Sequence, residues 1–330
     1  MPGAPALAGA LCLVTAFGFA AAQASPLPTR DQNPLLAGFG LPMPLPARVD
    51  PGHAWSIAAD LNWSNSALAQ SRASEYLIVD AETREARITV QRTLRAGTDR
   101  PALMLHLQVP YRYTGAGTLD GMIEEWHEAF GLPGGERAVL PRDDLRIEYR
   151  AGGDRRIDIA DSERGPGDTS LALGYALTAR PASAAAAWLH LKLPTGGAGR
   201  LTGSGAADAS ILVAGEHRFG GKWTAFGQAA VTWLGRGDLL PAQQRSVAWS
   251  GLAGLGWHLW RALELKVQLN AHTAVFERTR LDFLGDAAVL SVGAAYRFAS
   301  GWQLDAGVSE DVLVETSPDV VFVLGLRHAR

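Results

Sequence analysis

Polar side chains that could bind a solute or take part in catalysis recur at every second position in segments whose other residues are apolar. Asp60 and Asn62, for example, alternate with Leu61 and Trp63. Reading the other segments the same way gives fourteen candidates, namely Asp60, Asn62, His106, Gln108, Arg112, Asp168, His190, Lys192, Glu216, Arg218, Glu264, Lys266, His272 and Asp305. Acidic and basic residues are both present, and neither sign dominates.

One chemistry open to these residues is that of a pore lining. If they share one interior, mixed charges of this kind would line a weakly selective aqueous path, because charged side chains around a pore tune which solutes pass. The alternative is that they pair with one another across the interior as the polar core of a narrow, closed barrel. The residue types leave both alternatives open.

Catalytic and metal-binding patterns are weak by comparison. The chain has eight histidines, and His217 lies on an apolar phase beside Phe219, but no Gly-x-Ser-x-Gly nucleophile motif occurs. Glu124 and His127 have the i, i+3 spacing of a metal pair, although one pair without further ligands is no metal site. The sequence therefore predicts no catalytic set, no metal site and no cofactor, and an outer-membrane hydrolase ranks third among the functions considered.

The elements that position the candidates are β-strands, because only a strand places alternate residues on opposite faces. Period-two alternation is strong in twelve segments: 53–63, 86–95, 102–113, 168–178, 185–193, 208–219, 222–234, 246–258, 261–274, 287–298, 301–310 and 319–328. Most are long enough to match the roughly nine to eleven residues with which a strand crosses a bilayer. A weaker segment covers 144–150, and a barrel of fourteen strands is the alternative to one of twelve.

The connections between these segments alternate in length. Short links cover 96–101, 179–184, 220–221, 259–260 and 299–300, and long links cover 64–85, 114–167, 194–207, 235–245, 275–286 and 311–318. Outer-membrane barrels have short turns at the periplasmic end and long loops at the outer end. The pattern predicts an all-β, transmembrane, antiparallel up-and-down barrel over residues 53–330.

Composition and aromatic residues agree with a membrane barrel. Tryptophans on the apolar phase lie near strand ends, as Trp223 and Trp233 do, which suits two interfacial girdles. A soluble barrel of the lipocalin type is the alternative, but its outer face would carry more Lys and Glu. The sequence contains no run of eighteen apolar residues, so it predicts no membrane-spanning helix. The net charge of −3, without a basic stripe, argues against nucleic acid as a partner.

Two segments precede the predicted barrel. Residues 1–24 combine a short apolar stretch with Ala22-Gln23-Ala24, which predicts a signal peptide and therefore export to the cell outer membrane. Residues 25–52 are rich in proline and leucine and lack alternation. They form either a plug in the lumen or a simple tether, and the sequence does not choose between them.

The longest link, 114–167, contains a predicted short helix. Apolar residues at helical spacing share one face, and Gly131 and Pro133 end the pattern. This helix either folds into the lumen as a constriction or lies on the outer surface against a partner or lipid. The candidates for a constriction are Leu119, Glu124, Trp126, His127 and Phe130.

Several motifs along the chain match one protein family. Asn33-Pro34-Leu35-Leu36 with Gly40-Leu41-Pro42, the stretch from Leu119 to Gly134, Gly167 to Leu171, and Leu191 to Gly196 occur in order. With these motifs the chain resembles domain-of-unknown-function family 3187, a set of predicted Gram-negative outer-membrane proteins. The resemblance implies a barrel in that membrane and no settled activity. Arg330 departs from the terminal aromatic residue with which such barrels usually end.

The sequence thus favours a porin-like channel for passage or binding of a small solute. A structural or surface-binding barrel with a filled lumen is the second hypothesis. The partners expected are outer-membrane lipid, the barrel assembly machinery and a small solute.

Overall fold

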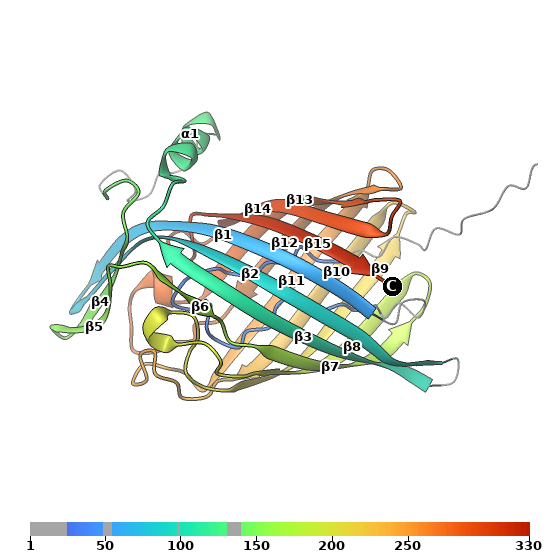
Figure 1. Cartoon of the computed structure of the whole chain (residues 1–330), viewed down its shortest axis with the longest axis horizontal. Coiled ribbons are helices and arrows are strands. Elements are labelled where there is room, and N and C mark those ends of the chain that lie inside the picture. The colour runs from blue at the N-terminus through green and yellow to red at the C-terminus, as the bar shows by residue number, and fades with distance from the viewer. Residues whose placement is uncertain (1–24, 49–54, 98–99, 131–139) are drawn as a thin grey trace, which may run out of the picture.

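The computed structural model describes residues 25–48, 55–97, 100–130 and 140–330. Within them, twelve antiparallel strands form a closed barrel (Figure 1). These strands are β1 (Trp55–Arg72), β2 (Glu75–Gly97), β3 (Arg100–Gly115), β7 (Ser170–Ala179), β8 (Ser183–Lys192), β9 (Asp208–Phe219), β10 (Trp223–Trp233), β11 (Val247–His258), β12 (Leu263–His272), β13 (Ala287–Arg297), β14 (Trp302–Asp311) and β15 (Val320–Ala329). The predicted all-β barrel is confirmed.

The barrel closes between its first and last strands. β1 pairs antiparallel with β15, so that Trp63 lies opposite Phe322, and each other barrel strand pairs with its neighbour in the chain. Closure leaves no strand edge facing lipid, where an unpaired backbone group would be costly. The short turns and both ends of the barrel sequence lie at one end, and the long connections lie at the other (Figure 1).

The predicted loop 64–85 is wrong, because β1 and β2 continue through it to a tight turn at Ala73 and Ser74. The alternation that marks a lipid-facing strand is lost there for a physical reason. This extension stands beyond the apolar belt, and Leu68, Leu77 and Val79 pack against loops. With polar residues such as Asn65 and Ser66 also buried, no period of two separates the faces.

Three further strands lie outside the barrel order. β4 (Arg146–Ala151) pairs with the part of β2 that extends beyond the barrel and with β5 (Asp154–Ile159). β6 (Glu163–Pro166) pairs with the C-terminal end of β3. The weak segment 144–150 therefore corresponds to β4. β4 adds to the sheet only at the long-loop end and is not part of the closed barrel wall. The barrel therefore has twelve strands and not fourteen.

The outer face carries the apolar belt that the alternation predicts. Leu173, Leu189, Ile211 and Val267 are between 46% and 56% exposed although they are aliphatic. Near the short-turn end, Trp223 and Trp257 on paired strands stack with ring centroids 5.7 Å apart. No helix in the described ranges is long and apolar enough to span a membrane.

An apolar cluster closes the long-loop end. We call it the cap core. Its 23 buried residues come from segment 33–41, the β1–β2 extension, β4, β5 and the loops after β8, β10 and β12. Phe39 and Phe276 meet edge to face within it, with centroids 5.3 Å apart. The cap core is the main apolar packing that ties the loops together at this end.

The predicted helix forms as α1 (Asp120–Phe130), after β3. Ile123 of the helix and Leu119 just before it are buried and pack against Val320, Phe322 and Trp63, which lie on the outward phase of β15 and β1. Figure 1 shows α1 at the long-loop end of the molecule, outside the barrel. The helix therefore occupies the outer-surface position of the two that the sequence allowed, and its described contacts are not with the lumen.

Candidate functional site

The lumen is occupied by residues 25–48, which we call the plug. Figure 1 shows it as the blue coil enclosed by the strands. Most of its residues are buried, including polar Thr29, Asp31, Gln32 and Asn33. Residues 25–48 thus lie inside the barrel, and a role as a plug rather than a tether stays a prediction. Residues 49–52 lie outside the described residues, as does the predicted signal peptide 1–24.

The first limb of the plug runs along β12. The Gln268 side chain accepts the N–H of Leu27 at 2.9 Å, and Asn270 donates to the carbonyl of Thr29 at 3.4 Å. His272 lies 2.9 Å from Asp31. From one contact to the next, the position moves by two residues in the plug and by two residues in β12, because inward-facing residues of a strand recur with that period. Alternation along β12 thus provides a polar ladder for the plug.

The plug turns back at the long-loop end, over segment 33–41. The Asn33 side chain accepts the N–H of Leu35 at 2.9 Å and donates to the Phe283 carbonyl at 2.7 Å. Leu35, Leu36 and Phe39 are then buried in the cap core. The Asn-Pro-Leu-Leu motif therefore builds a turn and anchors it to the loops.

The second limb returns towards the short-turn end along β8, β9 and β10. Gln228 accepts the N–H of Leu45 at 2.9 Å, and the indole of Trp188 donates to the Pro46 carbonyl at 3.1 Å. Arg48 ends the limb in an ion pair with Glu216, with Nε 2.5 Å from Oε1. Because Glu216 is near the short-turn end of β9, the plug enters and leaves the lumen at the same end.

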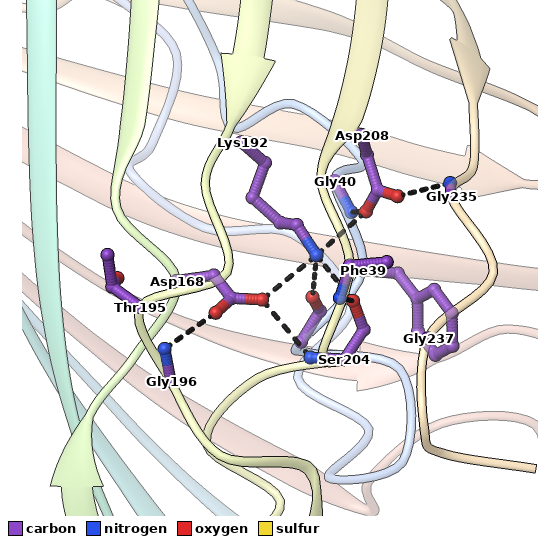
Figure 2. Close-up of polar contacts among 12 residues, drawn as sticks. Phe39, Gly40, Asp168, Lys192, Thr195, Gly196, Ser204, Asp208, Gly235 and Gly237 are labelled. Atoms are coloured by element: carbon purple, nitrogen blue, oxygen red, sulfur yellow. Dashed lines mark hydrogen bonds and ion pairs between the residues drawn. The ribbon is translucent and has the colours of Figure 1, made fainter.

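A buried lysine joins the plug turn to the wall and to the loop after β8. Nζ of Lys192 lies 2.9 Å from Oδ2 of both Asp168 and Asp208, and it donates to Ser204 and to the Gly38 carbonyl (Figure 2). We call Lys192, Asp168, Asp208 and Ser204 the latch. Their side chains are buried, so these contacts act where water screens them little.

Both aspartates of the latch also bind backbone N–H groups. Asp208 accepts from Gly40 of the plug and from Gly235 of a second loop, each at 2.8 Å (Figure 2). Asp168 accepts from Gly196 at 2.7 Å and from Ser204 at 3.1 Å. The latch thus joins the plug turn to two long loops.

Glycine is required where the plug turn meets these loops. A Cβ on Gly38 would lie 2.6 Å from the backbone carbon of Gly203, and one on Gly40 would lie 2.5 Å from the Cβ of Asp208. Real Cβ atoms do not approach so closely, so the backbones meet only because both residues lack a side chain.

A cluster of arginines lies beside the first limb. Glu85 forms ion pairs with Arg87 and with Arg112, and Arg112 also donates to the carbonyls of Leu201 and Ala37. Arg30 of the plug donates to two backbone carbonyls and has no ion pair in the described part of the chain. This side of the lumen therefore holds more positive than negative charge.

Several cavities remain between the plug and the wall, and two of them lie next to each other. The larger, of about 120 Å³, lies at the short-turn end between the plug and strands β1, β2, β3 and β15, and Asp60, His106 and Gln108 are among its lining residues. A smaller one of about 40 Å³ lies next to it, and Met43, Arg87 and Gln108 line both. The second cavity reaches Asp168 and Lys192, so the latch lies at its far end.

The structure brings most predicted lining residues into contact with the plug or with one another. Asn62 donates to Pro28, Lys266 pairs with Asp305 at 2.9 Å, and His190 lies 3.5 Å from Ser210 in the second cavity. Glu264 lies apart, 3.7 Å from His258, and Arg218 is half-buried near the short-turn end. Whether these residues line an open pore stays a prediction.

The predicted constriction residues fall on or next to α1. Leu119 packs on the outward face of the wall, and Glu124 pairs with Arg142 of the same long connection. The side chains of Trp126, His127 and Phe130 lie outside the described residues.

Several residues that bind the plug or surround it are absent from the sequence-predicted candidates. Glu85 was assigned to a loop, and Arg87, Asp208, Gln228 and Gln268 were left out although they occupy the polar phase of their strands. Arg87 lies within the predicted segment 86–95, and Glu85 lies two residues before it, so extending that segment by one residue places both on the polar phase. No group of three or more potential metal ligands occurs among the described residues.

Comparisons with known proteins agree with this fold. The model of the family described as "Protein of unknown function (DUF3187)" matches residues 8–329, which confirms the resemblance found in the sequence. No curated protein matches the chain. The COG4313 outer membrane channel from Pseudomonas putida F1 is 15% identical with a TM-score of 0.61, and the match covers 86% of this chain and 100% of that chain.

Two further solved structures are more distant. The Ralstonia pickettii toluene transporter TbuX is 9% identical with a TM-score of 0.43, over 84% of this chain and 90% of its own. The CymD monoaromatic hydrocarbon channel is 11% identical with a TM-score of 0.43, over 93% and 99%. At these scores we draw only the fold conclusion, a closed antiparallel β-barrel like that of the COG4313 channel, and we draw it from that structure alone.

Proposed function

The chain belongs to the DUF3187 family, and from this premise we propose that it is a porin-like outer-membrane channel for a small solute, closed by its own plug. One observation carries the proposal. A single segment, residues 25–48, fills the lumen through noncovalent contacts and leaves two neighbouring cavities that share lining residues along one wall. On this account the signal peptide directs export, and outer-membrane lipid and the barrel assembly machinery are the partners.

The chemistry of the wall favours a plug that moves. The wall residues facing it include Gln228, Gln268, Asn270 and Lys192, whose side chains bind plug backbone groups. Water can form equally good hydrogen bonds with these side chains when the plug leaves the lumen. A lumen built to stay filled is stabilised at least as well by apolar packing, because burying ion pairs gives little net stability.

A permanently filled barrel that acts through its outer end is the second candidate. The cap core favours it, because 23 buried residues join the loops and the plug turn into one apolar unit. On that account β4, β5 and α1 present a fixed surface to a partner.

Solute flux into proteoliposomes separates the two candidates. The Lys192→Met variant removes the central cation of the latch, and Lys222→Met removes an exposed lysine at a short turn as the matched control. The channel proposal expects glycerol-sized solutes to enter faster with Lys192→Met than with the control. Equal, background-level flux from both folded proteins would favour the filled barrel.

A further inference from the structure

The larger cavity contains a buried guanidinium with a free donor. The side chain of Arg87 is 3% exposed, and its Nη2 is bound to Glu85. Its Nη1 has no hydrogen-bond partner in the described structure, and the Oδ2 of Asp60 is 3.9 Å away. Thr89, two residues along the same face of β2, has a buried hydroxyl without a partner among the described residues. Unsatisfied buried donors are costly, so two in one cavity indicate a missing acceptor.

A second guanidinium faces the same cavity from β15. Arg327 lines it and forms no hydrogen bond or ion pair with the residues that the structure describes. The third lining arginine, Arg48, is paired with Glu216. Asp60 is the one acidic residue among those that line the cavity in the described ranges, so positive charge is in excess.

The opposite side of the cavity is apolar. Met43, Pro44, Leu45 and Pro46 of the second plug limb face it. Its volume of about 120 Å³ is close to that of a cavity of about 150 Å³ known to hold benzene, so the occupant is a molecule of only a few carbon atoms.

We propose that this cavity binds a small organic monocarboxylate. The carboxylate accepts hydrogen bonds from Arg87 and Thr89 and is attracted by Arg327, and the short apolar body lies against the plug limb. Guanidinium groups bind carboxylates through charge-assisted hydrogen bonds, which a neutral amide of the same shape does not reproduce. The inference rests on the proposed function, since it names the class of solute that the lumen would take.

Equilibrium dialysis with labelled butyrate tests the site on the full mature protein folded in detergent. Butyramide and butylammonium are the matched neutral and cationic competitors. We expect unlabelled butyrate to displace the label at a concentration at least about tenfold lower than butyramide, the ratio for one strong charge-assisted contact. Butylammonium should not displace it. Equal competition by butyrate and butyramide would overturn the proposal.

Variants locate the bound anion. Arg327→Gln removes a charge that attracts Asp60 and Asp305 but forms no hydrogen bond or close ion pair with the described residues, so it leaves the known ion pairs intact. Lys222→Gln removes the same charge at an exposed turn. We expect about tenfold weaker butyrate binding with Arg327→Gln and unchanged binding with Lys222→Gln. Thr89→Val, which preserves shape, should also weaken binding. Unchanged binding in both cavity variants would contradict the assignment.

The dialysis result is independent of flux. Flux through the Lys192→Met barrel without selective butyrate binding would contradict the anion site and would still support the channel proposal. Selective binding without flux in any variant would support the site and count against the channel.

Discussion

Oδ2 of Asp208 lies 2.9 Å from Nζ of Lys192 and also accepts the N–H of Gly40 at 2.8 Å. One carboxylate at the start of β9 thus links the end of β8 to the plug turn. Because Asp168 shares the same lysine, the latch contains two buried acids and one base. The ion pair therefore connects the stability of the wall to the position of the plug.

Replacing Lys192 should destabilise the barrel and not only the plug. Lys192→Met leaves the Asp168 and Asp208 carboxylates buried without their cation, which typically costs about 3–5 kcal/mol. Urea unfolding in lipid vesicles measures this as a lower midpoint, and Lys222→Met should unfold like wild type. Identical midpoints for the two variants would show that the latch does not hold charge as described.

The plug turn should not tolerate a single methyl group. Gly38→Ala places a Cβ within 3 Å of the backbone of Gly203 and Ser204, so the turn must move. Gly199→Ala, in the same long loop, is the control, because its Cβ meets nothing within 4 Å. Hydrogen exchange of the Gly40 N–H, which Asp208 accepts, should quicken in the first variant only. Slow exchange in both would mean that the loops yield without disturbing the plug.

The cap core should hold the plug turn through aromatic packing. Phe276→Ala removes the edge-to-face partner of Phe39 and opens a cavity, at a cost of about 3–5 kcal/mol. The exchange protection of Phe39 should fall accordingly. Phe298→Ala, which removes an outward ring near the short-turn end, should leave that protection unchanged; equal protection in the two variants argues against the packing role.

Tyr149 should report on the cap in alkali. It lies on β4, outside the membrane, where burial and then the hydrogen bond that it donates to Glu75 raise the pKa of Tyr149 to about 12. The neutral phenol therefore stabilises the folded cap below pH 10, and this contribution is lost as the pH rises from 10 to 12.

The wild type minus Tyr149→Phe difference in absorbance near 295 nm isolates this phenol. The difference should rise only near pH 12. A difference complete by pH 10.5 would mean that Tyr149 is not buried in the cap.

The barrel was predictable from the sequence because lipid imposes a period of two on every strand that crosses it. Leu263 to His272 shows this fully, with each polar residue facing inward. This period of two is imposed only on the part of a strand that lies within the lipid. Beyond the belt, residues 64–85 pack against other loops, so a strand with buried Leu68 and buried Asn65 lacks the signature.

The site was predictable only in part. Alternation identified Lys192 and Asp168 as inward-facing, but pairing with Asp208 depends on two loops and the plug turn meeting, which no local pattern records. The plug itself has no period, because its backbone groups are bound by side chains of several strands. Only Gly40 and the Asn33-Pro34 turn, both in motifs noted from the sequence, hinted at its path.

Single-channel conductance with and without the plug tests the central claim most directly. The protein from residue 25 onward and a version beginning at residue 49 would be refolded into planar bilayers, with heat-modifiable migration as the check on folding. The account predicts little or no current from the first and stable, much larger current steps from the second. Equal silence from two folded barrels would contradict it, because the lumen would then be closed by something other than residues 25–48.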